Sequence, residues 1–349
     1  MSKTLPIAPT PADPDDIGHN PSANPSFESI LQVRLIRRNM LKGGAGLAAT
    51  SFIGGGLAAC SSSDSSDSAA PPPVTPAAGP SLSFSAVAKS VADALVVPAG
   101  YTATAIYRLG DPLNANAGAF ANDGTDTASS FENRAGDHHD GINYFGLNTG
   151  GTARGENNSS RGLLCMNHEN ITQIFLHTPA QVAAYSIAAR AAAEVDKEVN
   201  VHGVSVVEVQ QVGASYAVNR ASTYNRRITA TTPADISGPA RGDDLMITKY
   251  SPSGTQTRGT LNNCAHGYTP WGTYLTCEEN WAGYFKRPAA TDNPNRTAKE
   301  VTALGRYGVT VANGNYGWAN VTPAADLYER WNATVTGSSA SADYRNISN

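Results

Sequence analysis

The stretch GLLCMNHEN, residues 162–170, carries a thiol, an imidazole and a carboxylate within five residues at the end of an apolar run. The same layout returns in GTYLTCEEN, residues 272–280, where Glu-Glu-Asn takes the place of His-Glu-Asn. Short apolar runs bounded by turn residues are typical of β-strands. Both stretches are therefore expected to be strands that end in polar side chains.

Most of the remaining chain shows the same strand-and-turn pattern. Further candidate strands are RGLLCMN (161–167), GINYFGL (141–147), HGVSVVEVQ (202–210), SYAVN (215–219) and DLMITKYS (244–251). Only residues 179–199 favour a helix, because they are rich in alanine and begin with Thr178 as a cap and Pro179 in the first turn. The 33 glycines and 14 tyrosines suit turns and sheet faces better than a helical bundle. The sequence predicts an all-β domain with one inserted helix.

The two related segments suggest a repeated sheet unit. They are about 110 residues apart, roughly two propeller blades of 40–50 residues plus an insertion, which the helix would supply. A β-propeller would direct carboxylates at the ends of its inner strands to the mouth of the central channel. A β-sandwich is the alternative architecture, and the repeat alone favours the propeller only weakly.

The first 60 residues have the features of an export signal. Arg37-Arg38 precedes a Gly-, Ala- and Leu-rich run, a pattern that indicates the twin-arginine export machinery. The alternative, a transmembrane helix, is disfavoured by the short and Gly-rich run. The run ends in LAAC, which resembles a lipoprotein box, so lipidation of Cys60 and ordinary cleavage nearby are both open. A membrane is expected as a partner only through that lipid.

A Ser/Pro/Ala linker, residues 61–80, follows the signal and has too few apolar residues to form a core. Residues 81–349 are then one folded domain. The formal net charge of the chain is −4, and no basic patch stands out. These features exclude nucleic acid as an expected partner. We expect a tethered domain that is periplasmic, extracellular or anchored by lipid to the outer surface of a membrane.

The polar residues at the strand ends suggest a metal site. Strand alternation puts Cys165 and Glu169 on one face. Glu278 and Glu279, adjacent at the end of an apolar strand, require compensating positive charge if they are buried, which a metal ion or an arginine would supply. Asp140 comes just before another apolar strand. Oxygen ligands with one thiol suit calcium together with a transition metal, for which iron is the obvious candidate, whereas the spacing expected of a zinc site is missing.

The histidines near these segments have a simpler interpretation. His168, His202 and His266 are more often structural side chains than ligands in such settings. The sequence singles out no attacking nucleophile.

Three segments together with the twin-arginine leader resemble the secreted PhoX-type alkaline phosphatases: RGLLCMNHEN (161–170), VHGVSVVEVQ (201–210) and NNCAHGYTPWGTYLTCEENWAGYF (262–285). The resemblance runs from about residue 99 to residue 284. It implies a six-bladed propeller whose channel mouth holds an iron–calcium cluster that hydrolyses phosphomonoesters. By motif match the family's cysteine ligand falls on Cys165 and an iron-binding glutamate on Glu278, with Glu169, Glu279 and Asp140 as further metal ligands.

Members of that family continue beyond the position of Asn349, so the resemblance implies either a fragment, the N-terminal part of a propeller, or a chain with a different tail, and it puts activity of these 349 residues alone in doubt. The leading hypothesis is an exported metal-dependent phosphatase that releases inorganic phosphate from phosphomonoesters. The alternative is a non-catalytic propeller, stabilised by calcium, that binds a carbohydrate or a protein. The thiol separates the two hypotheses, because a purely structural calcium site takes oxygen ligands.

Overall fold

The computed structural model describes residues 84–323 and 326–335, and the predicted export signal, Cys60 and the linker lie outside them. The described chain belongs to two units that divide between Thr104 and Ala105. The described part of the first unit, residues 84–104, has neither helix nor strand, and the rings of Phe84 and Tyr101 meet edge to face. Within the described residues no helix has both the length and the apolar character needed to cross a bilayer.

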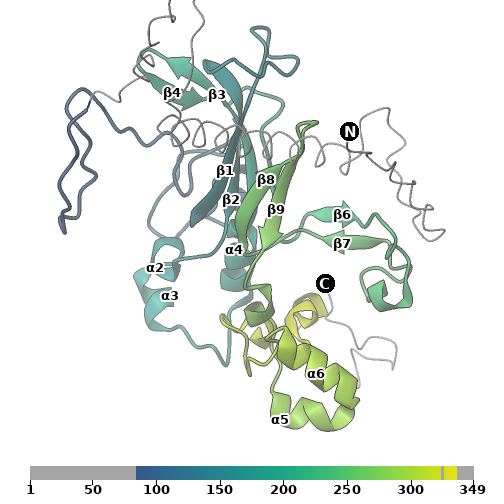
Figure 1. Cartoon of the computed structure of the whole chain (residues 1–349). Helices are drawn as coiled ribbons and strands as arrows, with labels where there is room; N and C mark the ends of the chain where they lie inside the picture. Colours follow the sequence, from purple (N-terminus) through teal and green to yellow (C-terminus); the bar gives the residue numbers. More distant parts are fainter. Residues whose placement is uncertain (1–83, 324–325, 336–349) are drawn as a thin grey trace, which may run out of the picture. The chain divides into compact units, whose positions relative to one another are not determined.

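The second unit is built on a five-stranded antiparallel sheet (Figure 1). Its strands are β1 (His139–Gly146), β2 (Arg161–His168), β3 (Gly203–Val212), β4 (Ser215–Val218) and β5 (Arg226–Ile228). The spatial order is β1-β2-β3-β4, and β5 also pairs with β3. β3 is buried from Gly203 to Val209, which its valine-rich sequence explains, because both faces are covered. The sheet forms where four of the apolar runs predicted it.

Two hairpins complete the sheet structure. They are formed by β6 (Pro233–Asp235) with β7 (Gln256–Arg258) and by β8 (Asn263–Tyr268) with β9 (Tyr274–Glu278). The turn of the second hairpin places Gly272 at φ +90°, a conformation that favours glycine. Figure 1 shows this hairpin beside β1 and β2, and the Tyr274 hydroxyl donates a 2.9 Å hydrogen bond to the carbonyl of Gly141. The two related sequence segments thus occupy different sheets, β2 and β9.

Short helices occur before, between and after the strands along the chain. The α-helices are α2 (Gln173–Leu176), α3 (Pro179–Ala183), α4 (Ala192–Val201), α5 (Ala289–Asp292) and α6 (Ala298–Arg306). The 3-10 helices are η2 (Ala128–Asn133), η3 (Asp244–Met246), η4 (Trp281–Tyr284), η5 (Asn293–Asn295), η6 (Trp318–Asn320) and η7 (Asp326–Trp331). The described residues are therefore rich in sheet but include several helices, more than the single insertion that the sequence predicts.

The predicted helix of residues 179–199 is two helices, α3 and α4. Its start is as expected: Thr178 caps α3 through the backbone N–H of Gln181, and Pro179 is in the first turn. Between the two helices the backbone of Arg190 forms a parallel bridge with Val321. The N–H of Arg190 donates to the Asn320 carbonyl, and the Arg190 carbonyl accepts the N–H of Thr322. This pairing breaks the helix, because tertiary contacts override alanine's propensity.

The segment predicted as a strand at residues 244–251 is not a strand. It begins with η3, where the Asp243 carboxylate accepts the N–H of Leu245 at 2.8 Å. An aspartate that caps a helical turn competes with strand pairing. The apolar residues of the segment do not indicate this helical turn. One of them, Leu245, is exposed rather than packed in a sheet.

The largest core cluster lies below the sheet, where α4 meets the C-terminal helices. Trp318 and Trp331 are buried there at 4.7 Å between ring centres. Fully buried Glu198 of α4 accepts hydrogen bonds from Arg190 at 2.6 Å and from the Trp318 indole at 2.7 Å. A buried carboxylate is tolerated here because it is paired and hydrogen-bonded.

Candidate metal centre

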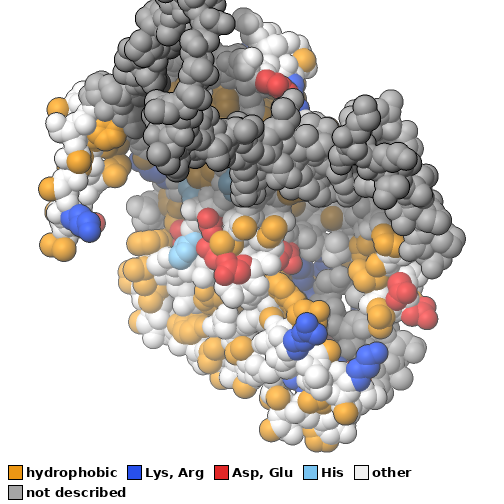
Figure 2. All heavy atoms as spheres, viewed as in Figure 1, with side chains coloured by type: hydrophobic (Ala, Val, Ile, Leu, Met, Phe, Trp, Pro, Cys, Tyr) orange, Lys and Arg blue, Asp and Glu red, His pale blue; other side chains and the backbone are white. Residues whose placement is uncertain are grey.

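Three side chains with metal-binding atoms converge beside the β8–β9 hairpin. The ligand atoms of Asp140, Glu169 and Cys264 all lie within 4.8 Å of one another. A fourth group, the Glu279 carboxylate, lies near enough to raise the pKa of both the Glu169 carboxyl and the Cys264 thiol. We call these four residues the acidic–thiol cluster. Figure 2 shows acidic side chains gathered at the surface on this face of the molecule.

Each member of the cluster stands where a strand bulges or ends. Asp140 lies in an irregularity of β1, between His139 and Ile142, and Cys264 lies in the corresponding irregularity of β8. Glu169 follows the last residue of β2, and Glu279 follows the last residue of β9. Bulges redirect side chains out of the regular alternation. Four groups from four strands can therefore point to one place.

Backbone hydrogen bonds fix the two glutamates that follow strands. The N–H of Glu169 donates to the His138 carbonyl, and the N–H of Glu279 donates to the Asn262 carbonyl, both at 3.0 Å. Both acceptor residues have positive φ, at +44° for His138 and +52° for Asn262. Such a backbone conformation is uncommon outside glycine and is often found at functional sites.

The electrostatics of the cluster favour a cation. Burial raises the pKa of Glu169, and the negative charges of Asp140 and Glu279 raise it further. The hydrogen bond to Asp140, followed by that to Glu279, raises the pKa of the Cys264 thiol to about 12. Each carboxylate makes the next negative charge more costly. A bound cation would reverse this penalty, so the donor set suits a metal ion.

A polar cavity of about 460 Å³ opens beside the cluster. Glu169 and Glu279 are in its wall together with the side chains of Asn262, Asn280 and Tyr307. A small polar molecule that enters this cavity would meet both carboxylates. The cavity thus adjoins two members of the cluster.

The structure brings three of the five predicted metal ligands together: Asp140, Glu169 and Glu279. It does not bring Glu278 to them. The Glu278 carboxylate accepts the Thr260 hydroxyl at 2.8 Å and the N–H of Leu261 at 3.0 Å, which fastens the base of the hairpin. Adjacent glutamates at a strand end thus point to different places, as alternation requires. That Asp140, Glu169 and Glu279 bind an ion stays a prediction.

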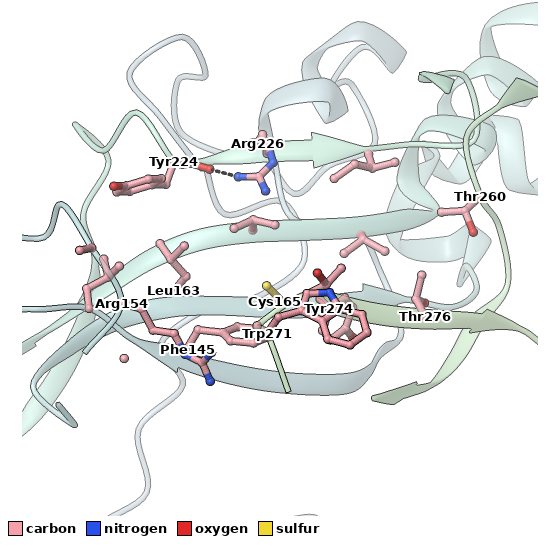
Figure 3. A pocket seen from close by; sticks show the side chains of 18 residues that line it. Phe145, Arg154, Leu163, Cys165, Tyr224, Arg226, Thr260, Trp271, Tyr274 and Thr276 are labelled. Carbon is pink, nitrogen blue, oxygen red and sulfur yellow. Dashed lines mark hydrogen bonds between the residues drawn. The ribbon is translucent and has the colours of Figure 1, made fainter. Parts of the chain in front are cut away.

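Cys165 also lies away from the cluster. It is buried in the middle of β2 and faces a second, mostly apolar cavity of about 670 Å³ (Figure 3). Burial raises the pKa of the Cys165 thiol to about 11. Leu163, Trp271 and Tyr274 surround the same cavity. A thiol in such surroundings behaves as a small apolar side chain.

The thiol that joins the carboxylates is Cys264, which sequence reasoning missed. The expectation for Cys165 used strand alternation from Cys165 to Glu169, but β2 ends at His168 and the alternation stops there. Cys264 comes directly after Asn262-Asn263, two turn-type residues at the start of β8, whose sequence NCAHGY is mixed rather than apolar. Turn residues inside a strand pattern are a signal for a bulge.

Comparisons with known proteins agree with this architecture. A sequence model of the family described as alkaline phosphatase PhoX matches residues 82–335. Pseudomonas fluorescens PhoX, solved in complex with vanadate, a transition state analogue, is similar in structure with a TM-score of 0.60 and 32% sequence identity. The match covers 71% of this chain and 38% of the Pseudomonas chain. No curated protein matches the sequence significantly.

The family match extends over well more than half of the chain and includes every residue of the acidic–thiol cluster. The structural match reaches similar coverage of this chain, although the chain spans only 38% of that relative. This protein belongs to the alkaline phosphatase PhoX family.

Proposed function

We propose that this protein is an exported, metal-dependent phosphatase that hydrolyses phosphomonoesters and releases inorganic phosphate. The observation that carries the proposal is the acidic–thiol cluster, in which Cys264 and Asp140, Glu169 and Glu279 meet beside a polar cavity. The similar Pseudomonas protein binds vanadate, a transition state analogue. A site of comparable chemistry would act here on a phosphate ester.

Calcium and iron are the proposed cations. Carboxylate oxygens are the ligands that calcium prefers, and a thiolate favours a transition metal such as iron. Asp140, Glu169 and Glu279 supply the oxygen atoms, and Cys264 supplies the sulfur. When bound, the cations supply positive charge that polarises the phosphoryl oxygens of the substrate.

The chain's own residues hold the site and receive the substrate. The three carboxylates offset the charge of the cations, and Cys264 must release its proton before it can bind one. The cavity beside Glu169 and Glu279 admits the ester group, and the Asn280 and Tyr307 side chains in its wall can hydrogen-bond a polar leaving group. We propose a phosphomonoester substrate because its dianionic phosphate group, with one more negative charge than a phosphodiester, would be attracted more strongly to the cations, while its organic group could enter this cavity.

The finer features of the proposal concern architecture and location. We propose that the sheets belong to a β-propeller and that the chain leaves the cytoplasm through the twin-arginine machinery. Arg37-Arg38 supports this route, and Cys60 is the residue that a lipid anchor would use. Export of a folded protein suits a site that is assembled from distant segments and loaded with metal.

The test measures metal and hydrolysis on the full chain. Metal content is determined on the purified protein, and hydrolysis of p-nitrophenyl phosphate is followed before chelation, after it, and after re-addition of calcium and iron. We expect both metals in the protein and a loss of hydrolysis on chelation that the two cations restore together. Calcium without iron, and no hydrolysis, would favour a calcium-stabilised propeller that binds a carbohydrate or a protein.

A further inference from the structure

Asn167 of β2 connects the main sheet to the β8–β9 hairpin. The residue is fully buried. Its amide nitrogen donates to the Cys264 carbonyl at 2.7 Å and to the Ala265 carbonyl at 3.4 Å. Its amide oxygen accepts the hydroxyls of Tyr274 and Thr276, each at 2.9 Å. One side chain therefore contacts both strands of the hairpin.

The two hydrogen bonds that the Asn167 amide nitrogen donates reach the hairpin where its strand pairing is irregular. The β8–β9 register shifts between Asn263 and His266, so Cys264 and Ala265 stand outside the regular ladder. A bulge leaves backbone groups without ladder partners. The Asn167 amide satisfies two such carbonyls and so determines the orientation of the backbone that carries the Cys264 thiol.

The contacts on the oxygen side link the same amide to Asp140. The Tyr274 hydroxyl lies 2.9 Å from the Asn167 oxygen and 2.9 Å from the carbonyl of Gly141, the residue after Asp140. The β1 irregularity and the β8 irregularity are thus held against the same buried side chain. Their side chains, Asp140 and Cys264, meet in the cluster.

We propose that Asn167 is a positioning residue that holds the Cys264 thiol beside Asp140 and Glu169 before any cation binds. The role requires an amide, because the nitrogen must donate to carbonyls while the oxygen accepts from hydroxyls. Aspartate keeps the shape and the acceptor but loses the donor, and its added negative charge would by itself slow alkylation and attract a cation, opposite to the effects of a displaced thiol. The consequence for metal binding rests on the proposed function, whereas the position of the thiol does not.

The experiment compares N167D with N225D in the full chain. Asn225 is a matched control, because its amide nitrogen also donates to two carbonyls, of Leu113 at 2.6 Å and Asn219 at 2.8 Å, and its oxygen also accepts, from the N–H of Glu208. It lies at the other end of the sheet. Both substitutions are made with Cys60, Cys165 and Cys277 replaced by serine, so that Cys264 is the one thiol left in the sequence.

Two measurements follow. The first is the alkylation rate of Cys264 in metal-free protein, which is slow while the thiol is held against carboxylates. The second is a titration with cobalt(II) alone, in which thiolate ligation gives a charge-transfer band. We expect N167D to speed alkylation and to weaken cobalt binding at least about tenfold with loss of the band. We expect N225D to leave both unchanged even though it removes comparable hydrogen bonds.

Equal effects of N167D and N225D, or unchanged alkylation in N167D, would overturn the proposal, because Asn167 would then only stabilise the fold. If N167D does not fold, Y274F tests the same point, since it removes one donor to the Asn167 oxygen and should speed alkylation to a smaller degree. Unchanged alkylation in Y274F would overturn it as well. A parent protein that binds no cobalt, combined with faster alkylation in N167D, would contradict the proposed function but support the positioning role.

Discussion

At the scale of single residues, two thiols of this chain have opposite surroundings. Cys264 lies beside the carboxylates of Asp140 and Glu169, whereas Cys165 is buried among apolar groups. We expect C264S to weaken cobalt(II) or iron(II) binding by at least about tenfold, about 1.4 kcal/mol, because a hydroxyl is a poorer ligand than a thiolate. C165S should keep the affinity and lose only stability. Metal titration of both variants checks this, and the reverse order would assign the ligand to Cys165.

The adjacent glutamates form a second matched pair. Glu279 faces the Cys264 thiol, whereas Glu278 fastens the hairpin through Thr260 and Leu261. We expect E279Q to lower cation affinity about tenfold, since an amide removes the charge at nearly equal shape. E278Q should leave affinity unchanged and cost about 1 kcal/mol of stability at most, because the amide oxygen can still accept. Calorimetric titration and urea unfolding distinguish these outcomes, and equal small losses of affinity would remove Glu279 from the site.

At the scale of elements, the close approach of β1 to β8 depends on a glycine. A Cβ atom at Gly141 would lie 2.7 Å from the Asn167 amide nitrogen and 2.7 Å from the Cys264 carbonyl oxygen. We expect G141A to push the strands apart, at a cost of about 1–3 kcal/mol in the free energy of unfolding, and to weaken cation binding.

Gly267 of β8 provides the control for G141A. A Cβ at Gly267 would have no heavy atom within 4 Å, so G267A should change stability by less than about 0.5 kcal/mol. Urea unfolding and cobalt titration of both variants make the comparison. If G141A binds cobalt as tightly as G267A, the strand spacing does not control the cluster.

The elements also show how far the sequence predicts this molecule. Apolar runs with turn residues at their ends located β1, β2, β3, β4 and β9, because strand alternation is a local property. The break between α3 and α4 was missed, since it comes from Arg190 pairing with residues some 130 positions later. Polar strand ends are a local pattern as well, and they pointed to Asp140, Glu169 and Glu279. Cys264 was missed, because a bulge and the docking of a hairpin bring it to these residues, and the turn residues before it indicate at most the bulge.

At the scale of the whole molecule, the core includes histidines that must stay neutral. Burial lowers the pKa of His202 to about 4. Its Nδ1 lies 2.7 Å from the Glu198 carbonyl, and its Nε2 lies 3.0 Å from the Tyr284 hydroxyl. In the unfolded chain a histidine binds its proton near pH 6.5. The unfolded state therefore binds more protons than the folded state between about pH 6.5 and pH 4.

This difference predicts that the contribution of His202 to the free energy of unfolding is complete above about pH 6.5 and decreases as the pH drops toward 4. The slope from one histidine is about 1.4 kcal/mol per pH unit, so the total loss is about 3 kcal/mol. H202Q should be less stable at pH 7.5, but its free energy of unfolding should depend less steeply on pH, by the contribution of one proton. Urea unfolding at pH 7.5, 6 and 5 measures the slope, and an equal slope in H202Q would mean that other groups cause the acid sensitivity.

The members of the acidic–thiol cluster are far apart along the chain, with Asp140 and Glu169 well before Cys264 and Glu279. Translation runs from the N-terminus, so a ribosome exposes two carboxylates first and the thiol only later. A half-finished chain can therefore offer a cation no more than a weak pair of oxygen ligands. If the cluster binds a cation as proposed, tight capture has to wait until the hairpin has emerged and docked, and a loaded site would mark a polypeptide whose synthesis and folding have passed Glu279.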